Sequence, residues 1–259
     1  MKGQRLGEPN ERRARRPRPR NPNRVERCLI KPTIRLPNPP DAVIFDMDGV
    51  LIDSNPFHLQ IWRDFLIRQR VAYDPELLPA QIFGQRDDKA LRMFLGADLR
   101  QEQVQRWSEE LEANFREVFR PHAQALPGVK ALIEECQEAG IPMAVASSAM
   151  KKNVEFVVDA LKFNSYFESV VSGDEVSHPK PDPEIYLLAA EHLGVDPRHA
   201  VAFEDSFIGI EAVVDAGMKC VAIASTFSEQ ELREETRANQ VVRSFEELNL
   251  AALRALFIG

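Results

Sequence analysis

The chain has 259 residues, of which 44% are hydrophobic and 28% are charged, and its formal net charge is −7. This is the composition of an ordinary globular protein with enough chain to bury a sizeable core. It contains no run of about eighteen apolar residues, so we expect no membrane-spanning helix and no membrane partner. The three cysteines, Cys28, Cys136 and Cys220, lie far apart. This spacing disfavours a disulfide framework or a thiolate zinc site and favours a reducing, cytoplasmic location.

The charge is divided unequally along the chain. Residues 1–40 hold twelve Lys and Arg, three Glu and eight of the 18 prolines, whereas residues 41–259 hold 21 basic and 37 acidic side chains. A segment this basic and this rich in proline cannot bury enough apolar surface to offset the entropy lost on ordering. We therefore expect a disordered tail over 1–40. Its charge alone would suit a nucleic acid or an anionic lipid. The alternatives are a solvated extension and a start codon assigned too far upstream.

Beyond the tail, short apolar runs alternate with amphipathic stretches. Runs bounded by turn residues predict buried parallel strands at 42–45, 141–146, 169–171, 200–203 and 220–224. Helical patterns follow at 129–139, 152–161, 183–193 and 207–216. Gly140, Gly194 and Gly217 come just after three of these helices, where a left-handed residue is expected. The alternation predicts an α/β fold with a Rossmann-like parallel sheet that is covered by helices on both faces.

Residues 57–121 interrupt this alternation. They contain helical patterns at 57–70, 87–95 and 102–119 and no convincing strand. We interpret a helical block after the first strand of an α/β sheet as an inserted domain, with prolines marking its linkers. The sequence therefore predicts a helical cap domain at 57–121 and an α/β core domain made of 41–56 and 122–259.

Acidic side chains stand where two of the predicted strands end. Asp46 and Asp48 follow the first strand, and Glu204 and Asp205 follow the fourth. The carboxyl ends of parallel strands meet at one edge of the sheet, where ligands bind in folds of this kind. Four converging carboxylates repel one another unless a hard cation is present, and Mg²⁺ with oxygen ligands suits them. An isolated Asp-x-Asp would equally fit a structural turn, but the second acidic strand end favours a metal site.

A lysine with a restricted backbone precedes the second acidic pair. Lys180 stands in the run HPKPDP, where the flanking prolines limit its backbone conformations. Most lysines are solvated surface groups, yet prolines this dense do not suit an ordinary surface turn. A fixed cation beside clustered carboxylates would keep a nucleophilic aspartate ionised and would attract a phosphate.

These motifs resemble those of the haloacid dehalogenase superfamily, in the branch with a small helical cap after the first strand. The first motif of that family, a hydrophobic strand followed by DxDG(V/T), is matched by DMDGV at 46–50. The second, a Ser or Thr ending the next core strand, is matched by Ser147, and the third, a Lys often in KPxP, by Lys180. The fourth, an acidic pair, is matched by Glu204 and Asp205. The resemblance covers about residues 41–250.

The resemblance implies a role for each of these side chains. Asp46 would be the nucleophile that forms an aspartyl-phosphate, and Asp48 would protonate the leaving oxygen and then take a proton from water. Ser147 and Lys180 would bind the phosphoryl oxygens. The ligands of Mg²⁺ would be the side chains of Asp46 and Asp205 and the backbone carbonyl of Asp48, with Glu204 in or near that shell.

Within the superfamily the chain is most similar to β-phosphoglucomutase and related sugar-phosphate phosphatases. This likeness implies that His58 couples cap closure to catalysis, although a helix-surface histidine is the alternative. Gly84 and Arg86 of the cap loop are further candidate substrate residues. The phosphate-binding Arg of the mutase would align with Asp87, which displaces Arg86 by one position. In addition, no Lys occurs between residues 106 and 130, where the mutase has one.

A mutase must bind the second phosphate of a bisphosphate, and a cap with one displaced cation is poorly equipped for that. We therefore expect a Mg²⁺-dependent phosphoric-monoester hydrolase acting on a small phosphorylated metabolite such as a sugar phosphate. A β-phosphoglucomutase-like isomerase is the alternative enzyme. The alternative outside enzymes is a nucleic-acid-associated regulatory protein that uses the basic tail.

Overall fold

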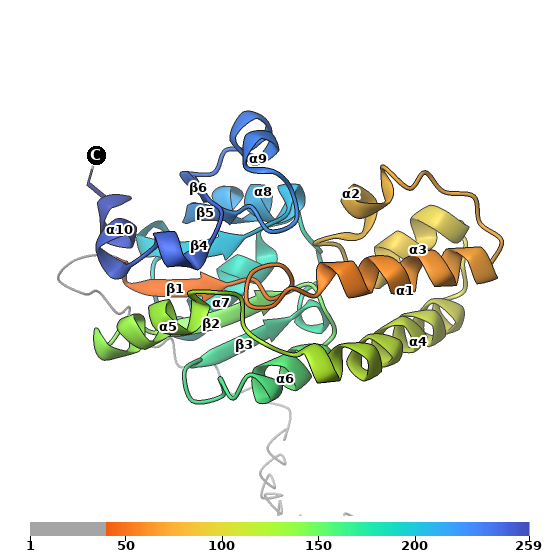
Figure 1. The fold of residues 1–259 in the computed structure, drawn as a ribbon, viewed down its shortest axis with the longest axis horizontal. Helices are drawn as coiled ribbons and strands as arrows, with labels where there is room; N and C mark the ends of the chain where they lie inside the picture. Colours follow the sequence, from red (N-terminus) through yellow and green to blue (C-terminus); the bar gives the residue numbers. More distant parts are fainter. Residues whose placement is uncertain (1–39, 259) are drawn as a thin grey trace, which may run out of the picture. The chain divides into compact units, whose positions relative to one another are not determined.

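The computed structural model describes residues 40–258. The tail expected over 1–40 therefore lies outside the described residues, except for Pro40. Within the described range, every helix is too short or too polar to cross a membrane. This part of the chain contains a parallel β-sheet, the helices that cover it, and a group of four helices between the first two strands (Figure 1).

Six parallel strands form the sheet in the order β3-β2-β1-β4-β5-β6, which confirms the predicted α/β, Rossmann-like class. The strands are β1 (Ala42–Phe45), β2 (Met143–Ser147), β3 (Ser169–Ser172), β4 (Ala200–Glu204), β5 (Lys219–Ile223) and β6 (Gln240–Val242). The first strand lies inside the sheet, where Val43 is opposite Met143 on one side and Val201 on the other. The loops that follow β1, β2 and β4 therefore leave the sheet side by side.

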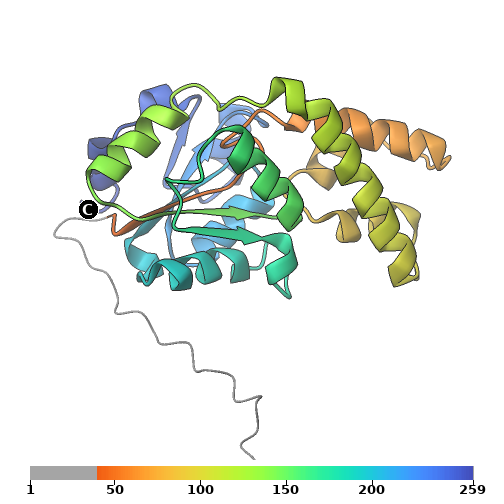
Figure 2. The same ribbon diagram turned by 90° about the horizontal axis from the view of Figure 1, so that it is seen from below.

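Helices cover both faces of the sheet (Figure 2). Alternate residues of the strands face these two helical layers. Val43 and Phe45 belong to a cluster of large apolar side chains, whereas Ala42 and Ile44 face a layer built largely from alanines. The helices of the first layer are α5 (Val129–Glu138), α6 (Lys151–Ala160) and α10 (Leu250–Ala255). Those of the second are α7 (Glu184–Leu193), α8 (Phe207–Asp215) and α9 (Glu229–Glu235). Small side chains on one face let α7 and α8 approach the sheet closely.

Four helices lie between β1 and α5 in the sequence. They are α1 (Asn55–Arg68), α2 (Leu78–Ile82), α3 (Asp87–Leu95) and α4 (Gln101–Phe119). We call residues 55–122 the helical insertion. Its interior is aromatic: Phe65 lies edge to face with both Trp62 and Trp107, at centroid separations of 5.8 Å. The division into a core and a cap domain at residues 57 and 121 stays a prediction.

The expected helices and strands are present, with ends that differ by one or two residues. Gly140, Gly194 and Gly217 have φ values of 68°, 70° and 80°, as expected for residues that end helices. The structure adds α2, α9, β6 and α10. The sequence did not predict these short elements because each spans seven residues or fewer, and α9 buries only Leu232. Such segments show too few periods to be recognised.

Candidate active site

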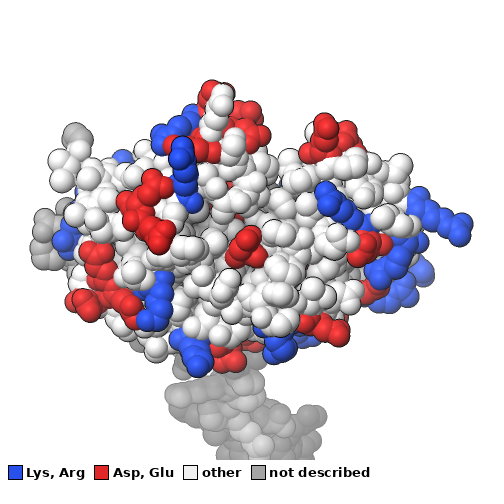
Figure 3. Space-filling model, viewed as in Figure 1, with Lys and Arg blue, Asp and Glu red and all other residues white. Residues whose placement is uncertain are grey.

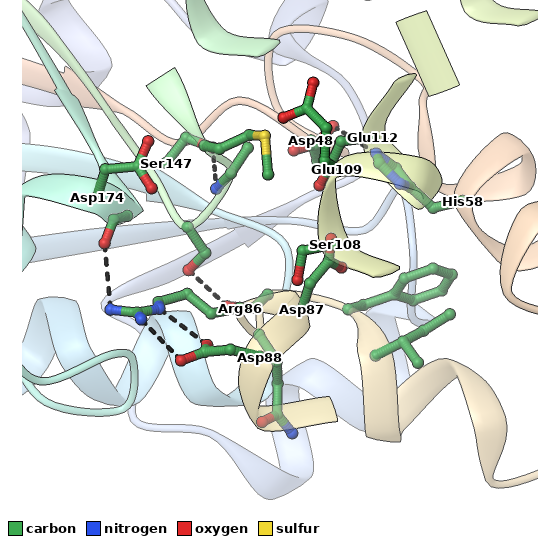
Figure 4. A pocket seen from close by; sticks show the side chains of 18 of the residues that line it. Asp48, His58, Arg86, Asp87, Asp88, Ser108, Glu109, Glu112, Ser147 and Asp174 are labelled. Carbon is green, nitrogen blue, oxygen red and sulfur yellow. Dashed lines mark hydrogen bonds and ion pairs between the residues drawn. The ribbon is translucent and has the colours of Figure 1, made fainter. Parts of the chain in front are cut away.

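A cavity of about 540 Å³ lies between the carboxyl edge of the sheet and the helical insertion (Figure 4). Asp46, Asp48 and Ser147 line it from the core, and residues of α1, α3, α4 and the 82–88 loop line it from the insertion. The position agrees with the rule that ligands bind beyond the carboxyl ends of parallel strands. Its volume suits a small organic ligand.

Asp46 and Lys180 form a buried ion pair at the core end of this cavity. The Lys180 Nζ donates to Asp46 Oδ1 at 2.6 Å, and Lys180 is only 1% exposed. Burial raises the pKa of Asp46 to about 8, and the Lys180 ammonium opposes this rise. Burial would lower the pKa of Lys180, but the Asp46 and Glu204 carboxylates outweigh it and raise this pKa. Lys180 is therefore a fixed cation next to a buried carboxylate and not a solvated surface group.

Glu204 positions this lysine. Its Oε1 accepts from Lys180 Nζ at 2.5 Å and from the Tyr186 hydroxyl at 2.7 Å. Its Oε2 accepts from the backbone N–H groups of Asp205 and Ser206 and from the Ser206 hydroxyl. Burial opposes ionisation, but the charge of Lys180 and these hydrogen bonds lower the pKa of Glu204. With five hydrogen bonds accepted, this carboxylate has little capacity left for a metal ion.

Asp205 is held from the other side. Its Oδ2 accepts from Asn55 Nδ2 at 2.9 Å and from the Thr226 hydroxyl. Burial, followed by the charges of Glu204 and Asp46, raises the pKa of Asp205 well above its usual value. Gly49 makes this approach possible, because its φ is +76° and a Cβ there would lie 1.9 Å from Asp205 Oδ2.

Asp46, Glu204 and Asp205 form a buried acidic cluster in which one oxygen of each lies within 4.8 Å of the others. Among the described residues, Lys180 is the only cation that forms an ion pair in this cluster, with Asp46 and with Glu204. The described residues donate no hydrogen bond to Asp46 Oδ2 or Asp205 Oδ1. When all three groups are ionised, the cluster with Lys180 has an excess of two negative charges. This charge and the two free oxygens fit a divalent cation with oxygen ligands.

Asp48 is oriented by two residues at the start of the insertion. Ser54 Oγ donates to Asp48 Oδ1 at 2.5 Å, and His58 Nε2 lies 3.4 Å from the same oxygen. Burial acts to raise the pKa of Asp48, but the hydrogen bonds and charge of these neighbours lower it overall. The His58 ring stacks on Phe115 at a centroid separation of 4.1 Å, which fixes its plane. His58 is therefore part of the site and not a free surface histidine.

The remaining predicted core residue, Ser147, is 1% exposed at the end of β2 and accepts from the Ala149 N–H. Its neighbour Ser148 donates to the Gly84 carbonyl at 2.7 Å, which joins the core to the insertion. The structure thus brings Asp46, Asp48, Ser147, Glu204 and Asp205 to one edge of the sheet, with Lys180 behind them.

Arg86 lines the cavity, but its donors are directed elsewhere. The guanidinium makes two hydrogen bonds to the Asp88 carboxylate and one each to the carbonyls of Gly173 and Val176. Four of its five N–H groups are therefore engaged within the protein. Figure 4 shows those directed at Asp88. This arrangement braces the 82–88 loop against the core and leaves little capacity to bind a ligand.

Sequence reasoning missed several contributors to the site. Asn55 and Thr226 hold Asp205, Tyr186 holds Glu204, and Glu112 lines the insertion side of the cavity. Thr226 follows β5 at the same edge of the sheet, so its position at a strand end was a usable signal. Glu112 stands on the buried face of α4, 6% exposed, and a charged residue on an apolar helix face was the signal there.

Comparison with known proteins places the chain in one family. The sequence model of the family described as "Haloacid dehalogenase-like hydrolase" matches residues 43–223. This range includes both acidic strand ends, Ser147 and Lys180.

Two relatives are identical to the chain at about a third of the aligned positions. A phosphorylated carbohydrates phosphatase of Thermotoga maritima is 33% identical over 179 residues, which cover 69% of this chain and 82% of the relative. A fructose-1-phosphate phosphatase of Escherichia coli is 34% identical over 185 residues, which cover 70% of this chain and 95% of the relative.

Solved structures agree with this assignment. A hydrolase of family IA, variant 3, from Entamoeba histolytica superposes with a TM-score of 0.76 at 26% identity, covering 84% of this chain and 99% of that protein. The shared fold includes the helical insertion, since the aligned part exceeds the core alone. The chain belongs to the haloacid dehalogenase-like hydrolase family.

Proposed function

We propose that this protein is a Mg²⁺-dependent phosphoric-monoester hydrolase that acts on a small phosphorylated carbohydrate through an aspartyl-phosphate at Asp46. The observation that carries the proposal is the buried Asp46 carboxylate at the core end of the cavity, 2.6 Å from the Lys180 ammonium. Phosphatases of phosphorylated carbohydrates among the relatives support the substrate class.

The acidic cluster supports the metal requirement. Asp46 and Asp205 would hold Mg²⁺ through their free oxygens, and the Asp48 backbone carbonyl would complete the protein ligands. Glu204 would act mainly by holding Lys180, because its oxygens already accept five hydrogen bonds. Bound Mg²⁺ would neutralise charge on the phosphoryl oxygens and lower the raised pKa of Asp46.

The reaction would proceed in two displacements at phosphorus. In the first, an Asp46 oxygen bonds to phosphorus as the ester P–O bond breaks. Asp48, which would take up a proton when the negatively charged ester binds beside it, gives that proton to the leaving oxygen. In the second, a water oxygen attacks phosphorus and gives a proton to Asp48, while the bond to Asp46 breaks and inorganic phosphate leaves. Lys180 and Ser147 would hold the phosphoryl oxygens in both steps. Ser54 and His58 would keep Asp48 aimed at the leaving oxygen.

The mutase alternative shares this chemistry and differs at the insertion. An isomerase must hold the second phosphate of a bisphosphate, which calls for a free cation facing the cavity. Lys152 and Arg86 are the Lys and Arg side chains that line the cavity among the described residues. Each is paired with a carboxylate, Glu109 and Asp88 respectively. This pairing favours hydrolysis over transfer.

The regulatory alternative rests on the basic tail, which lies outside the described residues. Over the face in Figure 3, Lys and Arg alternate with Asp and Glu without forming one continuous basic field. The described part of the chain thus offers, on that face, no additional support for nucleic-acid binding.

A phosphate-release screen over sugar phosphates, nucleotides and phosphoglycolate tests the proposal. With Mg²⁺ present, we expect release from at least one sugar monophosphate, and no acceleration by added glucose 1,6-bisphosphate.

Asp46→Asn should reduce turnover by roughly a thousandfold or more, because an amide is a poor nucleophile. The exposed Asp53→Asn is the matched control and should retain activity. Substantial turnover by Asp46→Asn, or isomerisation without phosphate release, would overturn the proposal.

A further inference from the structure

The wall of the cavity formed by the insertion is acidic. Asp87 begins α3 and Glu112 lies on α4, and both line the cavity on the side opposite Ser147 and Asp174 (Figure 4). Each of the two carboxyl groups acts on the pKa of the other. Neither carboxyl group forms an ion pair with a described cation: Arg86 pairs with Asp88, and Lys152 of α6 pairs with Glu109. The charges of His58 and Arg116 oppose the rise in the pKa of Asp87 and of Glu112, respectively, without outweighing it.

Glu112 is fixed from behind by the core. Asn153, fully buried on α6, donates from Nδ2 to Glu112 Oε2 and accepts from Arg116 Nη1 at 2.5 Å. Burial, followed by the charge of Asp87, raises the pKa of Glu112 well above its usual value. Burial also raises the pKa of Asp87, to about 6. Both carboxyl groups are therefore harder to ionise than an exposed carboxyl group.

Some acceptors in this wall lack a donor. Asp87 Oδ2 and Gln85 Oε1 are buried and receive no hydrogen bond from the described residues. Buried acceptors of this kind cost free energy until a ligand or water supplies donors. Hydroxyl groups of a ligand would supply them, whereas a second phosphate or a carboxylate would add acceptors and like charge.

We propose that Asp87 and Glu112 are specificity-determining residues that select phosphomonoesters whose body carries hydroxyl donors and no second anionic group. The proposal rests on the proposed function, because the phosphate of the ester must occupy the core end of the cavity for its body to reach this wall. Asp87 accepts from a hydroxyl of the body, and Glu112, held by Asn153, presents the second carboxyl group of this wall. A second anion at the same position meets buried carboxyl groups that form no ion pair among the described residues.

A matched pair of ligands tests this charge selection. Sorbitol 6-phosphate and 6-phosphogluconate differ in one group, a terminal hydroxymethyl in the first and a carboxylate in the second. Both are measured as competitive inhibitors of p-nitrophenyl phosphate hydrolysis by the Mg²⁺-loaded full chain. We expect the wild-type inhibition constant to be at least about tenfold larger for 6-phosphogluconate, since a factor of ten corresponds to a modest charge repulsion. In the double variant Asp87→Asn with Glu112→Gln, the ratio should fall to within about threefold of one.

The control is Glu110→Gln, which removes the same charge from α4 at an exposed position paired with Arg68. It should leave the ratio of the two inhibition constants at the wild-type value. Equal constants in the wild type, or a ratio unchanged in the double variant, would overturn the inference while p-nitrophenyl phosphate hydrolysis keeps the proposed function. Absence of any hydrolysis by the wild type would instead remove both.

Discussion

The two ends of the cavity are built in different ways. At the core end, residues that follow β1, β2 and β4 meet because the strands are neighbours in one sheet, and Glu204 accepts hydrogen bonds on both of its oxygens. At the insertion end, Asp87 and Glu112 meet across two helices, and Asp87 Oδ2 lacks a donor. In the proposed function the first end holds the phosphoryl group, and the second end keeps acceptors available for the rest of the ligand.

This difference predicts at which end of the cavity a substitution will lower the stability of the protein. Asp46, Lys180 and Glu204 form one charge network, so a change in one member leaves another buried charge without its partner. Asp87 and Glu112 at the insertion end form no ion pair among the described residues, so either can lose its charge without leaving a cation unpaired. We therefore expect substitutions at the core end to affect both folding and turnover, and substitutions at the insertion end to affect selectivity.

The largest effect should come from Lys180→Met. Removing this buried ammonium leaves Asp46 and Glu204 without a counter-charge, which should cost about 3–5 kcal/mol of the free energy of unfolding and abolish turnover. Urea unfolding and phosphate release measure the two effects. Adding Glu204→Gln to this variant should restore part of the stability and none of the activity. A stable Lys180→Met variant would show that the ion pairs contribute little to folding.

A smaller effect is expected from Asp205→Asn, which separates metal binding from folding. The variant should bind Mg²⁺ about tenfold or more weakly by calorimetry, since it loses a charged ligand. In metal-free buffer its melting temperature should match or exceed that of the wild type, because the raised pKa of Asp205 shows that the ionised carboxylate is unfavourable there. Asp53→Asn should change neither quantity. Unchanged Mg²⁺ affinity in Asp205→Asn would place the cation elsewhere.

The contacts between core and insertion should differ in strength according to burial. Asn153→Ala removes a buried amide that bonds both Arg116 and Glu112, and should cost about 1–3 kcal/mol of unfolding free energy. Lys152→Ala removes an exposed ion pair with Glu109 and should cost less than about 1 kcal/mol. Urea unfolding measures the loss of unfolding free energy in each variant. An equal loss in both variants would contradict this prediction.

The core end was predictable because its signals are local. Asp46, Asp48, Glu204 and Asp205 each follow an apolar run, and a parallel sheet brings such strand ends together whatever the loop details are. No comparable rule exists for the pairing of Asp87 with Glu112, which depends on the crossing of α3 and α4.

Arg86 illustrates the same limit at the scale of one residue. Its position in the sequence predicts a cation near the substrate, but its direction is decided by Asp88 and by two carbonyls of the core more than eighty residues away. Likewise, Asn55 and Thr226 meet at Asp205 across a separation of 171 residues. Such contacts follow from tertiary packing and leave no periodic pattern in the sequence.

The smallest effect concerns the pH dependence of stability. Burial raises the pKa of Asp87 from 3.8 to about 6, so between these values the folded protein keeps a proton that the unfolded chain has released. Stability contributed by this group is therefore lost as pH rises from about 4 to about 6.

Asp87→Asn removes that dependence. The melting temperature of this variant should therefore fall less than that of the wild type between about pH 4.5 and about pH 6.5. Glu112 and Asp205 keep their own raised pKa values and preserve the rest of the slope. Glu110→Gln, which changes an exposed carboxylate on the same insertion, should retain the wild-type slope, and an unchanged slope in Asp87→Asn would show that Asp87 is not buried with a raised pKa in solution.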